Sequence, residues 1–291
     1  MSDTSKYHLT KGASADGPYD VLVTPESAGW GYSGLRILTL GPGEAHSLST
    51  HDCEFLVLPL TGSCTVTTEG RTFELEGRTG VFASVTDFAH LPSESEALIS
   101  SAHGGRFALP SARTERDRLT PRYGRKEDVP VELRGAGACS RQVNNYCLPG
   151  TFDAEQLLVC EVLTPGGNWS SYPPHKHDEA RPGEESQLEE IYYFEISGGE
   201  QGFGYQRVYG TPERPIEVLA EIRSGDTVLI PHGWHGPSIA APGYALYYLN
   251  VMAGPGQDRA WLICDDPAHG WVRTTWQSQD VDDRLPFGED R

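Results

Sequence analysis

The segment Tyr172-Pro-Pro-His-Lys-His177 decides how this 291-residue chain is interpreted. Alternate side chains of a β-strand point to one face, so His175 and His177 project together, which is the spacing needed to bind one metal ion. A polar loop at 178–188 follows, and then Glu189-Glu-Ile-Tyr-Tyr-Phe-Glu-Ile196, an aromatic-rich run that indicates another strand. The segment therefore predicts a metal site built on β-strands.

This second strand begins with two glutamates, and only one of them can face the interior. The face of Glu190 is otherwise apolar or aromatic, whereas Glu189 shares its face with Glu195. Because a strand turns its more apolar face to the core, Glu190 is the predicted metal ligand.

A third histidine ligand is expected from a distant strand. In Gly225-Asp-Thr-Val-Leu-Ile-Pro-His-Gly-Trp-His235 a proline ends an apolar run, and His232 and His235 are both candidates. We prefer His235, because it follows a glycine by the same ten residues that separate Gly80 from His90. Three imidazoles and one carboxylate suit a divalent ion that keeps positions open for substrate. Zinc is the preferred ion, with manganese, iron, cobalt and nickel as alternatives.

The rest of the chain has the pattern of an all-β protein. Its 33 glycines and 21 prolines separate short β-branched and aromatic runs, as in a sandwich or barrel. We expect few helices, with single turns near 113–118 and 154–156. The runs expected to form strands include 36–40, 54–60, 64–67, 156–163, 190–196, 204–209, 227–230 and 245–251.

The two halves of the chain share an order of landmarks. A Pro-Gly turn at 42–43 is followed by Glu54 and a glycine, and a Pro-Gly turn at 165–166 is followed by Glu190 and a glycine. Such a repeat indicates two copies of one β unit, which we divide into residues 1–125 and 126–291. The first copy lacks a His-x-His pair, so we expect it to have lost its metal, with His51, Glu54 and His90 as remnants.

Composition limits the partners and the compartment. Lys and Arg number 23 against 41 Asp and Glu, a net charge of -18 that repels nucleic acids and anionic lipids. We find no apolar run of about 18 residues and no apolar core of a signal peptide at the start, so neither membrane insertion nor export is expected. The six cysteines form no Cys-x-x-Cys pair. We expect a cytoplasmic protein whose substrate, if a carboxylate, needs a local positive charge.

The order of His-x-His, glutamate, glycine, proline and histidine resembles the metal site of cupins. It departs from the usual form in a longer loop before the glutamate and in a last histidine one residue early. Longer stretches are similar to the 5-deoxy-glucuronate isomerases, relatives of the 4-deoxy-threo-hexosulose-uronate isomerases, and the similarity is weakest in the first 130 residues. One departure is Gly-Trp-His-Gly at 233–236, where members often have Gly-Tyr-His-Pro. The stretches are 134–137, 140–145, 164–178, 188–193, 206–209, 246–255 and 265–269.

The resemblance implies a bicupin, with two tandem jelly-roll β-barrels and the metal in the second. The metal ligands of these isomerases fall on His175, His177, Glu190 and His235. The implied reaction interconverts 5-deoxy-D-glucuronate and 5-dehydro-2-deoxy-D-gluconate in myo-inositol catabolism. Such an aldose–ketose isomerisation passes through an enediol that the metal would stabilise. A homo-oligomer is also expected.

The general base stays open at this point. The candidates are a metal-bound hydroxide and the side chains of Glu189, Glu195, Tyr205 and His232.

Three cations could bind the carboxylate of a sugar acid. Arginine binds carboxylates through two parallel hydrogen bonds, and Arg207 lies on a predicted strand soon after Glu190, so we prefer it. Lys176 and Arg141 are the alternatives. Lys176 ranks lower, because a residue between His175 and His177 should face away from the metal.

Two other functions fit the same ligand set. A cupin dioxygenase would use iron and oxygen, and a non-catalytic cupin would bind a uronate without turnover. Fold and ligands alone do not decide among these chemistries.

Overall fold

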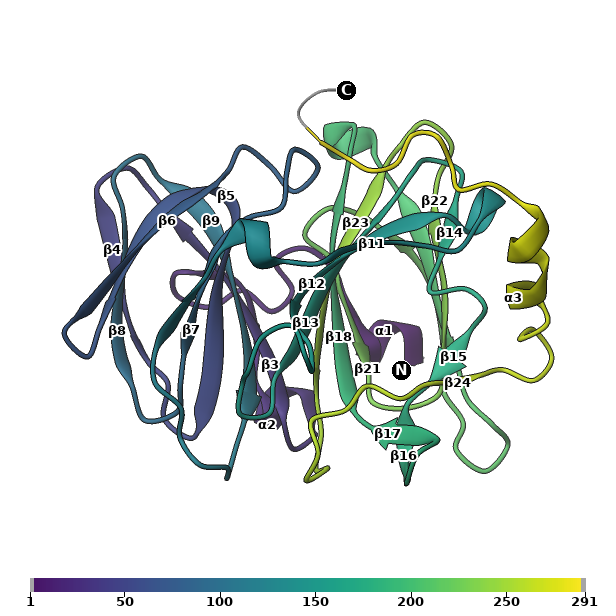
Figure 1. The fold of residues 1–291 in the computed structure, drawn as a ribbon, viewed down its shortest axis with the longest axis horizontal. Coiled ribbons are helices and arrows are strands. Elements are labelled where there is room, and N and C mark those ends of the chain that lie inside the picture. The colour runs from purple at the N-terminus through teal and green to yellow at the C-terminus, as the bar shows by residue number, and fades with distance from the viewer. Residues whose placement is uncertain (1–2, 289–291) are drawn as a thin grey trace.

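The computed structural model describes residues 3–288 and shows two β-barrels side by side (Figure 1). The predicted all-β bicupin with few short helices is confirmed. All six cysteines are free. No helix within residues 3–288 is both long and apolar enough to cross a membrane.

One continuous sheet closes around the first barrel, because the long strand β5 belongs to both of its walls. The predicted runs 54–60 and 64–67 are parts of this one strand rather than two. Gly62 lies between them with φ +78°, and a Cβ there would lie 2.5 Å from the carbonyl oxygen of Gly104, so only glycine fits. The strand continues through it. The strands are β2 (Tyr19–Val23), β3 (Ser33–Leu40), β4 (Glu44–Ser49), β5 (Cys53–Thr68), β6 (Arg71–Arg78), β7 (Phe88–Leu91), β8 (Glu96–Ser101), β9 (Gly105–Arg113) and β10 (Arg122–Gly124).

Two facing sheets form the second barrel. The inner sheet, in the order β1-β21-β18-β23-β13-β12-β11, lies against the first barrel, and the outer sheet has the order β20-β19-β22-β15-β24 with β14 beside β22. The inner strands are β1 (His8–Leu9), β11 (Val131–Arg134), β12 (Arg141–Cys147), β13 (Leu158–Thr164), β18 (Glu189–Ile196), β21 (Thr227–Ile230) and β23 (Leu246–Ala253). The outer strands are β14 (Trp169–Ser170), β15 (His175–Lys176), β19 (Gly204–Tyr209), β20 (Glu217–Ile222), β22 (Trp234–Ala240) and β24 (Cys264–Asp265), and a hairpin is formed by β16 (Asp178–Arg181) and β17 (Glu185–Gln187).

Because side chains alternate along each strand, the two faces of the inner sheet pack into two different hydrophobic cores. On β18, Tyr192 and Phe194 pack into the core of the second barrel, whereas Ile191 and Tyr193 pack against the first barrel. Glu190 shares the first face and Glu189 the second. The period of two therefore decides which glutamate enters the barrel.

The start of the chain belongs to the second barrel. β1 pairs with β21, and α1 (Asp3–Tyr7) packs against β20. The last strand of the first barrel ends at Gly124 and the next strand begins at Val131. The sheets thus separate on either side of the division that we placed at 125/126, but residues 3–9 lie with the later half.

The helices are short and do not lie where helical turns were predicted. At 154–156, the backbone amides of 155–157 donate to the carboxylate of Glu54 instead of to helical carbonyls, and the chain at 113–118 leaves β9 as a loop. The helices besides α1 are α2 (Pro25–Ala28), α3 (Val272–Thr275) and the 3₁₀ turns Lys126–Asp128, Gly137–Cys139, Gly199–Gln201 and Trp276–Ser278.

The structural repeat of the two barrels does not include His235, which we had matched to His90 by its spacing from a glycine. His90 lies on β7, which pairs with β5 as β21 pairs with β18. His235 lies on the following strand, β22, in the outer sheet. His90 instead binds Glu54 at 2.8 Å in the buried contact between the barrels, while His51 is exposed.

Candidate metal centre and substrate pocket

Three buried histidines converge inside the second barrel. The ligand atoms of His175, His177 and His235 lie within 4.8 Å of one another. β15 and β22 are neighbours, and their register sets His175 directly opposite His235. Glu190 reaches the group from the inner sheet, with Oε2 3.0 Å from Nε2 of His235 and 3.3 Å from Nε2 of His177. The four predicted ligands are thus brought together.

The cluster has unused ligand atoms. Both carboxylate oxygens of Glu190, both ring nitrogens of His177 and Nε2 of His235 are buried and have no hydrogen-bond partner among residues 3–288. Burying so many polar atoms without hydrogen bonds is costly unless something binds them. A divalent cation would satisfy them together, so these residues fit a metal site.

The electrostatics favour the metal-binding forms of two ligands. Burial opposes the charge of Glu190, but His235 and His177 outweigh it and lower its pKa to about 2. Burial, with the two neighbouring rings, lowers the pKa of His175 well below its usual value. For His177, burial is outweighed by Glu190, and its pKa is raised. Glu190 is therefore an anion and His175 a neutral imidazole, as ligation requires.

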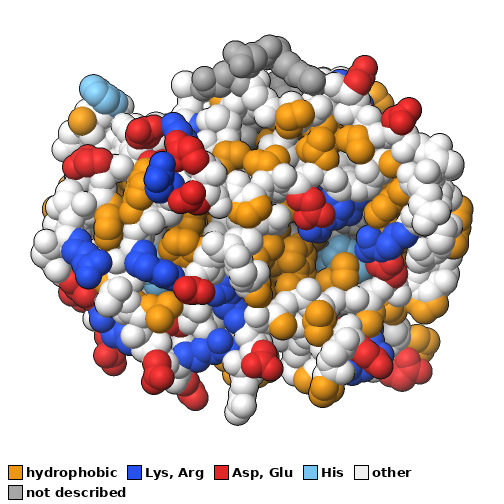
Figure 2. Space-filling model, viewed as in Figure 1, with side chains coloured by type: hydrophobic (Ala, Val, Ile, Leu, Met, Phe, Trp, Pro, Cys, Tyr) orange, Lys and Arg blue, Asp and Glu red, His pale blue; other side chains and the backbone are white. Residues whose placement is uncertain are grey.

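A cavity of about 330 Å³ lies beside the cluster, with His175 in its wall. Figure 2 shows this face hollowed over the second barrel, with histidine at the bottom of the hollow and basic side chains at its edge. Polar and charged side chains make up most of the wall, with a few apolar ones between them, which suits a small polar molecule. Its residues are Arg134, Arg141, Val143, Val162, Ser171, His175, Tyr192, Tyr248, Asn250, Trp261, Ile263, Asp265 and Arg273.

Three arginines line this cavity, and one of them lacks an acidic partner. Arg134 donates to both oxygens of Glu132, and Arg273 to both oxygens of Asp265. Arg141 is 5% exposed, and it donates a hydrogen bond to the carbonyl of residue 139 at 3.0 Å. Within residues 3–288 it forms no ion pair. Burial, together with Arg134 and Arg273, lowers its pKa to about 10, so it is charged at neutral pH.

A comparison with known proteins decides the family. The model of the KduI/IolB family matches residues 8–272. The chain belongs to the KduI/IolB family. A relative named 5-deoxy-glucuronate isomerase, from Geobacillus kaustophilus (strain HTA426), is 42% identical over 257 residues, which cover 87% of this chain and 90% of the relative. Its namesake from Bacillus subtilis (strain 168) is 38% identical over 252 residues, covering 86% and 91%. The resemblance to these isomerases and the assignment to the isomerase class are confirmed.

One solved structure agrees with this family, and another shares the fold. The crystal structure of an IolB-like protein from Salmonella typhimurium LT2 matches with a TM-score of 0.85 at 32% identity, covering 91% of this chain and 98% of that one. The oxalate decarboxylase of Lactobacillus farciminis, in a formate complex, has a TM-score of 0.59 at 14% identity, covering 84% and 82%. The second match shows a shared fold alone.

Two residues predicted to act in this KduI/IolB chain lie on the outer surface of β19. Tyr205 is 40% exposed. Arg207 is exposed as well, and its Nε lies 3.9 Å from Glu217. Both point away from the barrel, because Gln206 and Val208 occupy the inward face of that strand. The structure therefore separates Arg207 and Tyr205 from the cavity and places Arg141 in it.

The other predicted bases also lie outside the cavity. The carboxylate of Glu189 accepts the backbone amides of residues 31–33 in the first barrel, and Glu195 binds Arg106 at 2.6 Å in the same contact. His232 lies in the turn between β21 and β22, where burial lowers its pKa. Lys176 faces away from the cluster and binds Asp178 at 2.7 Å. Of the side chains named as bases, none lines the cavity within the described residues.

Sequence reasoning missed the carboxylate that does line the cavity. Asp265 lies on β24 directly opposite His175 on β15. The only signal for it was its place in the segment 265–269, which resembles the isomerases. Nothing in the local pattern shows that this late segment returns beside His175, because that pairing joins distant parts of the chain.

Proposed function

We propose that this protein is a metal-dependent 5-deoxy-glucuronate isomerase, which converts 5-deoxy-D-glucuronate to 5-dehydro-2-deoxy-D-gluconate in myo-inositol catabolism. The observation that carries the proposal is the buried cluster of three histidines and Glu190 beside a cavity with an unpaired arginine. Relatives at 38–42% identity bear the name of this activity.

His175, His177, Glu190 and His235 would hold a divalent ion, for which zinc is our proposal. A bound ion would act as a Lewis acid that polarises the aldehyde and stabilises negative charge on its oxygen. All four of these side chains are at least nine-tenths buried, so the protein shields them from bulk water.

Arg141 would bind the carboxylate of the substrate, which lies at the opposite end of the sugar acid from its aldehyde. Arg134 and Arg273 are each neutralised by a bidentate carboxylate, so Arg141 carries the free charge of the cavity. A buried guanidinium without an acid is costly, and an anionic ligand removes that cost. Arg141 would supply the local positive charge that a sugar acid needs in a protein of charge -18.

Asp265 is our proposal for the residue that moves the proton between C2 and C1. It is the carboxylate in the wall of the cavity and lies opposite His175. Burial raises the pKa of the Tyr192 and Tyr248 hydroxyls, so both stay protonated and can donate hydrogen bonds to substrate oxygens. A carboxylate and neutral phenols supply the acceptor and donors that proton transfer requires.

The test is conversion of 5-deoxy-D-glucuronate, followed by NMR under anaerobic conditions, before and after chelation and metal re-addition. We expect conversion that needs metal, does not need oxygen, and is lost in H175A. Conversion only with iron and oxygen would support a dioxygenase instead. A folded, metal-loaded protein that binds the uronate without converting it would support a binding role.

A further inference from the structure

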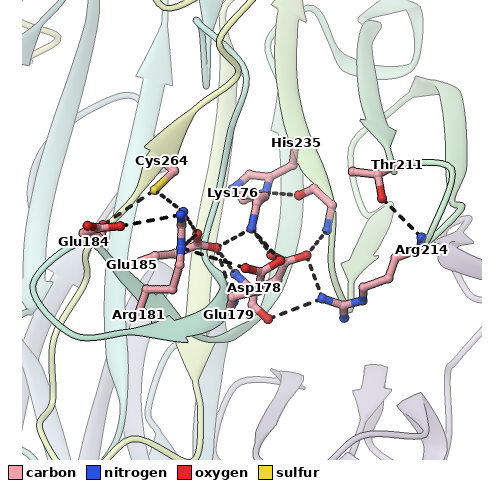
Figure 3. A network of polar contacts seen from close by, with 11 residues as sticks. Lys176, Asp178, Glu179, Arg181, Glu184, Glu185, Thr211, Arg214, His235 and Cys264 are labelled. Carbon is pink, nitrogen blue, oxygen red and sulfur yellow. Dashed lines mark hydrogen bonds and ion pairs between the residues drawn. The ribbon is translucent and has the colours of Figure 1, made fainter.

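Seven charged side chains form a network on the side of β15 that faces away from the metal cluster (Figure 3). Nζ of Lys176 lies 2.7 Å from Asp178, 2.8 Å from Glu185 and 3.3 Å from Glu179. Arg181 binds Glu185 and lies 3.6 Å from Glu184, and Arg214 lies 3.2 Å from Asp178. Three cations thus meet four carboxylates.

The centre of the network is buried. The side chains of Lys176, Asp178 and Glu185 are 10%, 8% and 0% exposed, while the four outer members are between 41% and 69% exposed. The buried centre has one positive and two negative charges, and the two arginines offset the excess. Buried charges of this kind require fixed geometry, because a displaced partner leaves an unpaired charge in a dry site.

The network contacts the ligand strands directly. Lys176 lies between His175 and His177, and Asp178 follows immediately. Oδ2 of Asp178 accepts the backbone N–H of Gly233 at 2.9 Å, and the carbonyl of Gly233 lies 3.2 Å from Nδ1 of His235. When Nδ1–H donates to that carbonyl, Nε2 is the atom left to face the metal.

The long loop before Glu190 contributes Glu185 to the same network. Glu185, at the return of the β16–β17 hairpin, accepts the backbone N–H groups of Asp178 and Glu179 at 2.9 and 3.2 Å. The N–H of Leu188 then donates to the carbonyl of His177 at 2.9 Å, two residues before Glu190. The loop therefore returns the glutamate to the histidines through contacts made by Glu185.

We infer that the Lys176–Asp178–Glu185 centre is a positioning network that fixes the metal ligands, with Asp178 orienting His235 through the backbone of Gly233, whose N–H and carbonyl each make one of the two contacts. The inference rests on the proposed metal site. Partners behind metal ligands typically contribute about 10- to 100-fold in metal affinity.

The test measures cobalt(II) binding to the metal-free protein by visible absorption, without substrate. We expect D178A to bind Co²⁺ about 10- to 100-fold more weakly than the parent, with altered visible bands. D178N keeps an oxygen for the Gly233 N–H and should recover part of the affinity. It also carries the test if D178A does not fold. K126M is the matched control, because it breaks an exposed Lys126–Glu76 pair of the same 2.7 Å length in the first barrel.

Parental affinity and spectrum in folded D178A would overturn the inference, as would an equal loss in K126M. A parent protein that binds no Co²⁺ would overturn both this inference and the metal site. If D178A alone loses affinity but the parent does not isomerise 5-deoxy-D-glucuronate, the positioning network stands and the proposed reaction fails.

Discussion

Oε2 of Glu190 lies 3.0 Å from Nε2 of His235, and the two residues come from opposite sheets of the second barrel. Glu190 is on the inner sheet that contacts the first barrel, and His235 is on the outer sheet. An ion held between them would join the two sheets. Metal binding should therefore change stability as well as activity.

We predict that metal raises the melting temperature of the chelated protein. A ligand that binds only the folded state adds about 2.7 kcal/mol at 100 times its dissociation constant. Thermal unfolding with and without Zn²⁺ measures this. E190Q should show little rise, and an equal rise in both proteins would place the ion elsewhere.

Replacement of Arg141 should weaken substrate use. Hydrogen bonds to charged groups contribute about 1.5–3 kcal/mol, so R141M should lower kcat/KM by about tenfold or more. R207M is the control and should stay near the parent value, because Arg207 lies on the outer surface. Steady-state kinetics on the folded variants measures this. A loss of kcat/KM in R207M with none in R141M would assign substrate binding to Arg207 instead.

The buried ion pair between the barrels should be sensitive to single substitutions. Arg78 and Glu161 are both 0% exposed in their side chains, and Glu161 also accepts from Tyr146 and Tyr247. R78M leaves the carboxylate unpaired and should cost about 3–5 kcal/mol in urea unfolding. The double variant R78M/E161L should be less destabilised than R78M. Equal stability of R78M and parent would show that the pair contributes nothing.

Glu54 should make docking of the barrels sensitive to acid. Burial raises its pKa, but His90 and the amides of Gln156 and Leu157 outweigh this, and the pKa lies below its ordinary value. The stability it adds is therefore complete above the unfolded value of about 4.3 and is lost as pH falls through the lower folded pKa. Urea unfolding of parent and E54Q should give a constant difference from pH 7 to 5 that shrinks below pH 4. A difference that grows in acid would contradict this.

Local pattern selected the residues of the buried cluster better than the residues of the cavity wall. Alternation along 189–196 separated Glu190 from Glu189, and the spacing of His175 and His177 set them on one face. His235 was chosen on a spacing shared with His90 that the fold does not keep, yet it is His235 that joins the cluster. We preferred Arg207 to Arg141, but Arg141 lines the cavity and Arg207 lies on the outer surface. Proximity in sequence does not show which face of β19 points inward.

The sequence by itself determined the β-rich bicupin, the family and the residues of the buried histidine–glutamate cluster. These follow from short-range periodicity and from motifs, which need no knowledge of distant contacts. Only the tertiary structure decided that Asp265 returns beside His175, that Arg141 is the arginine without an acid, and that residues 3–9 complete the second barrel. Each of these depends on pairing between strands far apart in the chain, and the free energy of that pairing comes from burial and register that no local pattern records.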